Sequence, residues 1–597
     1  MIGLIKIRVS IVAILLYLSY LPVSYAKQPS PSVNKNGPSV NVPSLIAPDA
    51  LSTQKPKLPH TKPGSLPSPP KFQLPSLPTS PKQEQPLSKK MTIFVQEIRL
   101  TGHTVFSDQE LKEITRHYEN RSVSNEELQA LRHQLTRYYI DHGYINSGVM
   151  LPDQEIKDGL IYLHVIEGKM TEMKINGNDW LRSSYIDDRI SQSFATPLNI
   201  KDVQERLQLL QQDPLIERIN AELRPGQKPG QSRINVQVTE ARPYELGIST
   251  ANNRSPSIGG ISGQVWLRHR NLTGFGDALY FSYSATEGLD DFFGSYSVPL
   301  TSYDTRLNLY YQNSEAFVVE NPIEDAFIRS TTETFGISLS QPLYKTPGQT
   351  LTLSLAFEHR RSRTFFNNEP FAFALGVPET GDDKGESKIS VLRFTQEWLD
   401  RSQTQVIAAR STFNFGMNVL DATHSNIDTV PDGQFFVWLG QFQWVRRLPW
   451  LDSQIIFRTD AQFANESLLP LEKMSIGGMH SVRGYRENQL VRDHGAVTSL
   501  ELRMPVFRLP IPVLSQSIID GQVQLAMFAD YGWSENQDLP TPDLKTIGSW
   551  GLGVLWDPSP KIHTALYWGV PFTNIREGLE HDLQDSGIHF SFNAQLF

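Results

Sequence analysis

From about residue 243 to the C-terminus, apolar and polar residues alternate in short segments separated by Gly, Asn, Asp and Pro. The segment 349–358, QTLTLSLAFE, is typical: Leu351, Leu353 and Phe357 share one phase, and Thr and Ser occupy the other. Because successive side chains of a strand point to opposite faces, each segment predicts a strand with one apolar, aromatic-rich face. We count about sixteen such segments, each roughly ten residues long, the length of a membrane-crossing strand.

Two architectures produce this alternation. A soluble β-sandwich buries the apolar face and exposes the polar one, whereas a membrane barrel turns the apolar face to lipid and the polar face to a lumen. The aromatic residues on the apolar face favour the barrel, as does a last strand that ends on Phe597, although Phe597 is out of phase with Phe590 and Phe592. We therefore expect residues 243–597 to form a transmembrane β-barrel of about sixteen antiparallel strands.

Residues 92–242 show a different pattern, in which strand-like and helix-like segments follow the order β-α-α-β-β twice. Two of the helices have clear N-terminal signals: Ser107 precedes one, and Ser124 with Glu127 three residues later precedes another. We expect two small α+β modules, at residues 91–168 and 169–242. Neither module contains a nucleophile–base pair or a metal-ligand spacing, so an enzymatic function is not expected.

The N-terminal 90 residues have two parts. Residues 1–26 carry Lys6 and Arg8, then a short apolar run and small residues up to Ala26, which predicts a secretory signal peptide; the alternative is a single membrane anchor. Residues 27–90 are rich in proline and predict an extended linker, with at most a short helix at 41–54.

Composition narrows the functional class. The chain has no cysteine and a net charge of −8, and 10% of its residues are aromatic. The charge argues against a nucleic-acid partner. An exported chain without disulfides must be held together by packing and backbone hydrogen bonds, or by a membrane. Composition and the export signal alone leave two classes, a soluble exported protein and an outer-membrane barrel, and the strand pattern favours the second.

A polar loop at about 466–493 interrupts the barrel pattern and contains the sequence MHSVRGYRENQ. If this loop folds into the lumen, Arg483 needs a carboxylate there, and the lumen phase of the next strands offers Asp530 first and Glu501 second. Gly484 would allow a sharp turn, and Tyr485 could pack on the wall. The alternative is a surface loop with solvated charges.

The residues around this loop carry a family resemblance. SIGGMHSVRGY followed by FADYG resembles the inner-loop motif and the lumenal strand motif of the BamA-type outer-membrane superfamily. The two β-α-α-β-β modules resemble POTRA domains. From about residue 92 to 597 the chain is similar to the two-partner secretion transporters (TpsB family, ShlB/FhaC/HecB haemolysin secretion/activation type). The motif positions that correspond are Val482, Arg483, Gly484 and Tyr485 in the loop, and Phe528, Asp530 and Gly532 in the strand.

The resemblance implies an outer-membrane pore with periplasmic POTRA domains that exports a large, unfolded partner exoprotein. Its POTRA domains would recognise the partner's N-terminal secretion domain, and we expect the edge of the second module at Arg218, Asn220 and Glu222 to take part. It also implies a plug helix, placed here at 41–54. No cofactor or metal is implied. Outer-membrane lipid and the barrel-assembly machinery are further expected partners. The alternatives are an outer-membrane assembly factor of the same superfamily and a porin.

Overall fold

The computed structural model describes residues 71–73, 92–321, 324–427, 430–515, 517–575 and 581–596. The signal peptide expected at 1–26, the short helix expected at 41–54 and the terminal Phe597 lie outside these residues. So does the linker expected at 27–90, except for residues 71–73. None of the helices in the described ranges combines the length and the apolar character that a membrane crossing requires.

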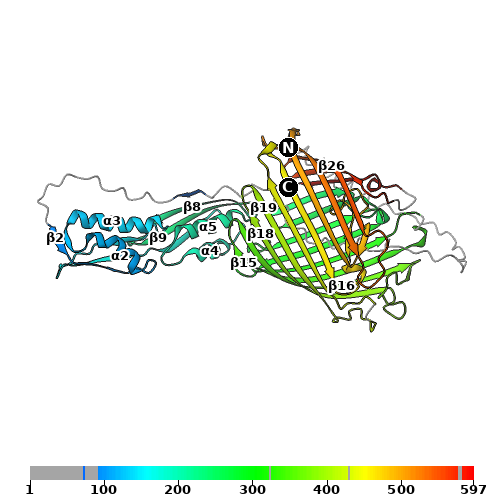
Figure 1. Cartoon of the computed structure of the whole chain (residues 1–597), viewed down its shortest axis with the longest axis horizontal. Coiled ribbons are helices and arrows are strands. Elements are labelled where there is room, and N and C mark those ends of the chain that lie inside the picture. Colours follow the sequence, from blue (N-terminus) through cyan, green and yellow to red (C-terminus); the bar gives the residue numbers. More distant parts are fainter. Residues whose placement is uncertain are drawn as a thin grey trace. The chain divides into compact units, whose positions relative to one another are not determined.

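The first module packs two helices against small sheets (Figure 1). Its elements are β2 (Thr92–Val95), β3 (Glu97–Thr101), α2 (Asp108–Thr115), β4 (Arg121–Ser124), α3 (Asn125–Asp141), β5 (Gly148–Met150) and β6 (Leu160–Ile166). Strand β6 lies between β3, to which it is parallel, and β5, to which it is antiparallel. The pair β2–β4 is a strand pairing that the sequence pattern did not predict.

Both predicted helix starts in this module are confirmed. Ser107 and Ser124 accept a hydrogen bond from the backbone N–H of the glutamate three residues later, and that glutamate accepts one in return from the serine N–H. These reciprocal bonds satisfy backbone donors that the first helical turn leaves unpaired. The apolar faces of α2 and α3 then bury Leu111, Leu131 and Leu135 against the sheet.

The second module repeats the order, with β7 (Lys169–Asn176), α4 (Ser183–Ile190), α5 (Ile200–Gln211), β8 (Ile216–Pro225) and β9 (Gln231–Glu240). Strand β9 is parallel to β7 and antiparallel to β8. The short strand β1 (Lys71–Gln73) adds to the free edge of β8 in parallel, with Lys71 opposite Asn220 and Gln73 opposite Glu222. Part of the N-terminal linker region therefore occupies a sheet edge of this module.

Within the described residues, sixteen antiparallel strands close into the barrel, and the two-residue strand β17 (Glu369–Pro370) extends one of its loops. The strands are β10 (Tyr244–Ala251), β11 (Ser262–His269), β12 (Ala278–Ala285), β13 (Leu289–Pro299), β14 (Arg306–Phe317), β15 (Arg329–Lys345), β16 (Gln349–Phe366), β18 (Glu386–Arg401), β19 (Gln405–Met417), β20 (Phe436–Arg447), β21 (Gln454–Ala464), β24 (His494–Arg508), β25 (Gln522–Glu535), β26 (Thr546–Ser559), β27 (Ile562–Pro571) and β28 (Ile588–Gln595). Pairing of β10 with β28 completes the closure.

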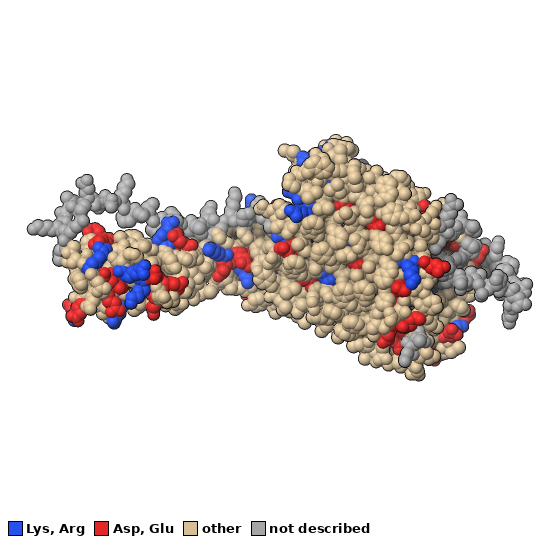
Figure 2. Space-filling view, in the orientation of Figure 1, with Lys and Arg blue, Asp and Glu red and all other residues tan. Residues whose placement is uncertain are grey.

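The outward and inward faces of the barrel wall differ in exposure and polarity. In β25 the outward residues Met527 and Tyr531 are exposed, whereas Phe528 and Asp530 point inward and are buried. Figure 2 shows few charged side chains on the visible wall of the barrel and many on the modules that precede it. An apolar exterior with a polar interior is the arrangement of a membrane barrel, not of a sandwich with an apolar core.

Candidate functional site: an inner loop anchored to the barrel wall

The segment between β21 and β24 does not extend into solvent but packs inside the barrel. It contains a short 3-10 turn at Pro470–Glu472 and a small hairpin of β22 (Met474–Ile476) and β23 (Leu490–Arg492). Met474, Ile476 and Val482 of this segment are buried against Val497 and Ile547 of the wall. This apolar contact determines which face of the loop packs against the wall. Polar contacts determine where along the wall the loop lies.

Arg483 meets Asp530 at the tip of the loop. Its Nε donates to Asp530 Oδ2 at 2.8 Å and its Nη2 donates to Oδ1 at 2.9 Å, which is the two-pronged geometry that a guanidinium makes with a carboxylate. The backbone N–H of Arg483 also donates to Asp530, at 3.1 Å. Both side chains are almost inaccessible to solvent, with residue exposures of 5% and 2%.

Glu501 and Ser499 complete the contacts of this guanidinium. Nη1 of Arg483 donates to Glu501 at 2.5 Å, and Nη2 donates to the Ser499 hydroxyl at 3.1 Å. Glu501 also accepts from Arg503 at 2.5 Å, so two arginines face two carboxylates and the group is formally neutral. We call Arg483, Asp530, Glu501, Ser499 and Arg503 the Arg483 cluster. Strands β24 and β25 pair Ser499 with Asp530, which explains why these groups converge.

Two aromatic rings contact the guanidinium. The Cζ atom of Arg483 lies 3.6 Å from the centroid of the Phe528 ring and 4.8 Å from that of Tyr567. Rings that face a desolvated cation stabilise it through their negative π faces. The Tyr567 hydroxyl also donates to Glu501, at 3.2 Å. Phe528 thus has a defined role two residues before Asp530: it covers the arginine that Asp530 binds.

Glycine is required where the loop and the wall approach each other most closely. Gly484 has φ +93, and a Cβ there would lie 3.0 Å from the backbone of Gly569. A Cβ on Gly532 would lie 2.6 Å from Ile476 and 2.9 Å from Val482. The missing side chain of Gly532 therefore makes the space into which the loop packs.

Tyr485 follows this turn and is buried. Its hydroxyl donates to the carbonyl of Gly548 at 2.9 Å and accepts from the backbone N–H of Thr573 at 3.2 Å. The side chain therefore joins the inner loop to β26 and to the loop after β27, beyond the wall packing that the sequence suggested.

Arg486 makes a second attachment, to two other loops. It donates to Glu320 at 2.8 Å, in the loop after β14, and through Nε to Asp585 at 2.5 Å, in the 3-10 turn Leu583–Ser586 before β28. Burial opposes ionisation of Asp585, but Arg486 holds the pKa of that carboxyl below its usual range. The return leg of the inner loop is thereby fixed to both loops.

Glu472 makes a third attachment, at the start of the inner loop. It accepts from Arg360 of β16 at 3.0 Å and from Arg393 of β18 at 2.8 Å. Glu358 accepts from the same two arginines, at 2.6 Å and 2.9 Å. We call Glu472, Arg360, Arg393 and Glu358 the Glu472 cluster; like the Arg483 cluster, it balances two positive with two negative charges.

Sequence reasoning identified part of this site. The structure places Arg483 against both carboxylates that the lumen phase indicated, Asp530 and Glu501. Ser499 was missed although it shares their phase. Tyr567, Arg486 and Glu472 were also missed, because their partners lie on strands and loops remote in sequence and no local pattern marks them.

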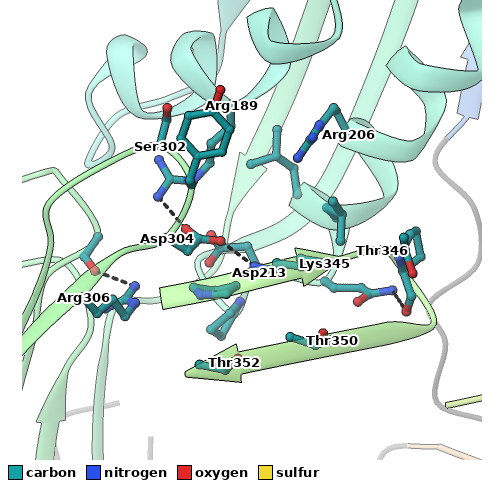
Figure 3. Close-up of a pocket in the computed structure, with 18 of the residues that line it drawn as sticks. Arg189, Arg206, Asp213, Ser302, Asp304, Arg306, Lys345, Thr346, Thr350 and Thr352 are labelled. Atoms are coloured by element: carbon teal, nitrogen blue, oxygen red, sulfur yellow. Dashed lines mark hydrogen bonds and ion pairs between the residues drawn. The ribbon is translucent and has the colours of Figure 1, made fainter. Parts of the chain in front are cut away.

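A cavity of about 970 Å³ lies where the second module meets the barrel. Figure 3 shows Arg189 and Lys345 on either side of Asp304, which accepts from Arg189 at 2.8 Å. Burial opposes ionisation of Asp304, but Lys345 and Arg189 hold its pKa below the usual range. Arg306 and Thr350, whose phase is that of the lumen, also line the cavity, so it lies at the mouth of the lumen.

The strand edge that we expected to bind the partner is paired with another strand of this chain. We expected Arg218, Asn220 and Glu222 to lie on an exposed strand edge. They lie on β8, but β1 pairs with this edge opposite Asn220 and Glu222. The edge is therefore already occupied over these residues, because a linker segment satisfies its backbone groups.

Comparison with known protein families gives two matches. The family described as haemolysin secretion/activation protein ShlB/FhaC/HecB matches residues 230–555, which is more than half of the chain. The POTRA domain of ShlB type matches residues 93–168, the first module.

Individual relatives agree with these matches. The outer membrane transporter CdiB of Dickeya dadantii (strain 3937) is 23% identical over 448 residues, covering 72% of this chain and 75% of the relative. The heme/hemopexin transporter protein HuxB of Haemophilus influenzae (strain 86-028NP) is 23% identical over 454 residues, covering 74% and 75%. The solved structure of CdiB from Escherichia coli superimposes with a TM-score of 0.64 at 19% identity, covering 87% of this chain and 93% of that one.

Proposed function

Because the chain belongs to the ShlB/FhaC/HecB family of haemolysin secretion/activation proteins, we propose that it exports one partner exoprotein across the outer membrane, in an unfolded state, through its barrel. The observation that carries the proposal is the polar lumen of a closed sixteen-stranded barrel, which contains a loop attached to the wall through ion pairs. Such a loop can hold a pore closed at rest and still be moved aside.

An assembly factor of the BamA type is the second candidate. The structure of BamA from Haemophilus ducreyi lacking POTRA domains 1–3 shares the fold, with a TM-score of 0.51 at 16% identity. The family match favours secretion. A porin is disfavoured because a channel for small solutes has no need of two folded modules ahead of its barrel.

Recognition of the partner is proposed to involve the second module. An extended segment of the partner could add to β8 near Arg218, Asn220 and Glu222, using main-chain hydrogen bonds. Because β1 pairs with the same edge, a partner strand and β1 cannot both occupy it. Capture on this edge therefore requires release of residues 71–73.

The cavity beside the second module offers an entry to the pore. Its lining includes Arg206, Arg306 and Arg401, which lie near the lumen mouth. We propose that a captured segment passes from β8 through this cavity into the lumen, where it displaces the inner loop. We propose two further partners. Outer-membrane lipid would contact the apolar outer wall, and the barrel-assembly machinery would assist insertion.

Deletion of the gene tests the function. The supernatant and the outer membrane of the deletion strain are compared with the wild type by mass spectrometry. We expect one large exported protein to disappear from the surface and medium, and co-expression of that protein with this chain in a different host to restore its export.

A general loss of outer-membrane barrels in the deletion strain would contradict the proposal and would favour the assembly factor instead. The wild-type gene returned on a plasmid is the control for indirect effects of the deletion.

A further inference from the structure

Two neighbouring turns on the periplasmic end of the barrel have exposed apolar tips. One joins β20 to β21 and carries Trp450 and Leu451, exposed by 61% and 60%. The other joins β24 to β25 and carries Val513 and Ile518, exposed by 91% and 92%. The turns are adjacent because β21 pairs with β24. They lie at the periplasmic end because β10 starts directly after the second module and the strands then alternate in direction.

Two hydrogen bonds attach Leu509 and Ser515 of the β24–β25 turn to β26, while Val513 and Ile518 remain exposed. The indole N–H of Trp556 donates to the carbonyl of Leu509 at 3.0 Å, and the Ser515 hydroxyl donates to that of Pro558 at 2.6 Å. Pro510 and Pro512 restrict the backbone further. Apolar side chains that a scaffold presents to the outside in this way mark a contact surface.

The apolar surface of the turn is continuous with the outer wall of the barrel. Leu500 and Met504 are in the outward phase of β24, and a bulge after Pro505 leaves Val506 and Phe507 exposed by 60% and 56%. The apolar face that contacts lipid therefore extends past the end of the strand and into the turn.

Basic residues flank the apolar tips. Arg446 and Arg447 precede the first turn and are exposed, as is Arg508 before the second. Arg447 pairs with Asp452 inside its own turn at 3.0 Å. Guanidinium groups beside Trp and aliphatic side chains match the phosphate and acyl layers of a phospholipid leaflet.

We propose that the β20–β21 and β24–β25 turns form an anchor that inserts into the periplasmic phospholipid leaflet. The proposal rests on the placement of the barrel in the outer membrane.

The position of the anchor around the barrel suits it to limit tilting of the barrel in the membrane. In the closed strand order β13 is the fourth strand and β24 the twelfth, so this anchor lies half-way around the barrel from the Asp304 turn that contacts the second module. It would hold the side of the barrel opposite the contact between Arg189 and Asp304.

Site-specific fluorescence tests the anchor. The chain has no cysteine, so Val513→Cys and Ile518→Cys each give a single labelling site for an environment-sensitive dye on the full-length protein. The labelled proteins are reconstituted in phosphatidylethanolamine and phosphatidylglycerol vesicles, with or without brominated acyl chains. We expect a blue-shifted emission at both sites and at least about a twofold loss of intensity in brominated lipid.

Two further variants make the result specific. Leu500→Cys, on the outer wall, should be quenched if the barrel spans the vesicle membrane; Gln403→Cys, in the polar β18–β19 turn, should keep a water-like emission. If Leu500→Cys is quenched but Val513→Cys and Ile518→Cys are not, the anchor is refuted. If Leu500→Cys itself is not quenched, the membrane placement fails instead. If the dye at Ile518→Cys is shielded from water in native membranes but not in vesicles, a protein covers the turn, and the lipid anchor is also refuted.

Discussion

Arg483 contacts five side chains of the barrel wall. Its guanidinium donates to two carboxylates and a hydroxyl and contacts two aromatic rings. A buried ion pair adds little net stability, because desolvation of the charges offsets their attraction, but the loss of one member leaves an uncompensated charge at a cost of about 3–5 kcal/mol. The cluster therefore fixes where the loop sits more than whether the barrel folds.

We predict that Arg483→Ala and Asp530→Ala each lower secretion of the partner by about tenfold or more, because either change removes the bidentate contact that positions the loop tip. Secreted partner is measured in the medium, and correct barrel insertion is checked by heat-dependent mobility in gel electrophoresis. Arg483→Lys should also be defective, since an ammonium cannot bind both oxygens of Asp530 in a planar fork.

Arg410→Ala is the matched control for these variants. Arg410 pairs with Glu397 at 2.5 Å and with Gln441, all on neighbouring strands of the wall. Its loss should leave secretion near the wild-type level. Normal secretion by both Arg483→Ala and Asp530→Ala would refute the proposed role of the loop.

Glu167 connects two parts of the first module and makes its stability depend on pH. The carboxylate accepts from the backbone N–H groups of Thr104 and Val105, at 2.7 Å and 3.1 Å, and from the Tyr139 hydroxyl at 3.3 Å. Burial raises the pKa of Glu167, but these hydrogen bonds outweigh it and hold the pKa below its usual range. A carboxyl whose pKa is lower in the folded state stabilises that state above its unfolded pKa, and the contribution disappears as the pH falls through the folded pKa.

We therefore predict that Glu167→Gln destabilises the first module at pH 7 by on the order of 1 kcal/mol, through loss of charge-assisted hydrogen bonds. The difference between variant and wild type should shrink as the pH falls below about 4, where the wild-type carboxyl also becomes protonated. Pulse proteolysis of the detergent-solubilised full chain in urea measures the unfolding of this module. A difference that does not change with pH would contradict the assignment.

At the residue scale, sequence reasoning succeeded where strand phase alone decides which side chains meet. Asp530 and Glu501 were found because both occupy the inward phase of strands near the loop in sequence. Glu472 was not found as a loop anchor, because its partners Arg360 and Arg393 lie on β16 and β18, far along the chain. Only the closure of the barrel brings those strands opposite the loop.

At the scale of elements, ion pairs attach the inner loop to the barrel at three points: Glu472 near its start, Arg483 at its tip and Arg486 on its return leg. The three points contact different parts of the barrel: β16 and β18, then β24 and β25, then two loops beyond the strand ends. Release at one point therefore loosens the loop without ejecting it.

We predict that Glu472→Gln increases the frequency of open-channel events in planar bilayers by several-fold. The change leaves Arg360 and Arg393 facing the single carboxylate of Glu358, so repulsion between the arginines should free the start of the loop. Single-channel recording measures this directly. Glu535→Gln, which removes an exposed pair with Lys545 at 2.6 Å, is the control and should leave the recordings unchanged.

The elements themselves were largely predictable. Capping signals at Ser107 and Ser124 located two helices, and alternation located the barrel strands, because both depend on residues adjacent in the chain. The pairing of β1 with β8 was not predictable, since residues 71–73 belong to a proline-rich segment without a strand pattern of its own. A free sheet edge accepts a backbone of almost any sequence, so the signal lies in the edge and not in the added strand.

At the scale of the whole molecule, the modules and the barrel are proposed to divide the work, with capture assigned to the modules and passage to the barrel. Each module has its own buried core, built around Leu131 and Leu135 in the first and Leu207 and Ile219 in the second. The barrel wall closes through its own strands, without a contribution from either module.

We predict that deletion of residues 92–168 abolishes capture of the partner's secretion domain and leaves a pore that conducts in planar bilayers. Binding is measured by calorimetry with the purified secretion domain, and conductance by bilayer recording. Retention of unchanged affinity by the shortened chain would show that the first module is not needed for capture.

The closing seam of the barrel has a consequence for how the protein is made. Strands β10 and β28 share five residue pairs, from Gly247 with Gln595 to Ala251 with Ser591, whereas the adjoining seams β10–β11 and β27–β28 share eight and seven. Among the sixteen described barrel strands, β10 is the first in the sequence and β28 is the last. A chain truncated before Ile588 lacks β28, so its sheet keeps unpaired edges at β10 and β27. We expect such a chain to be degraded by envelope proteases and not to form a leaky pore.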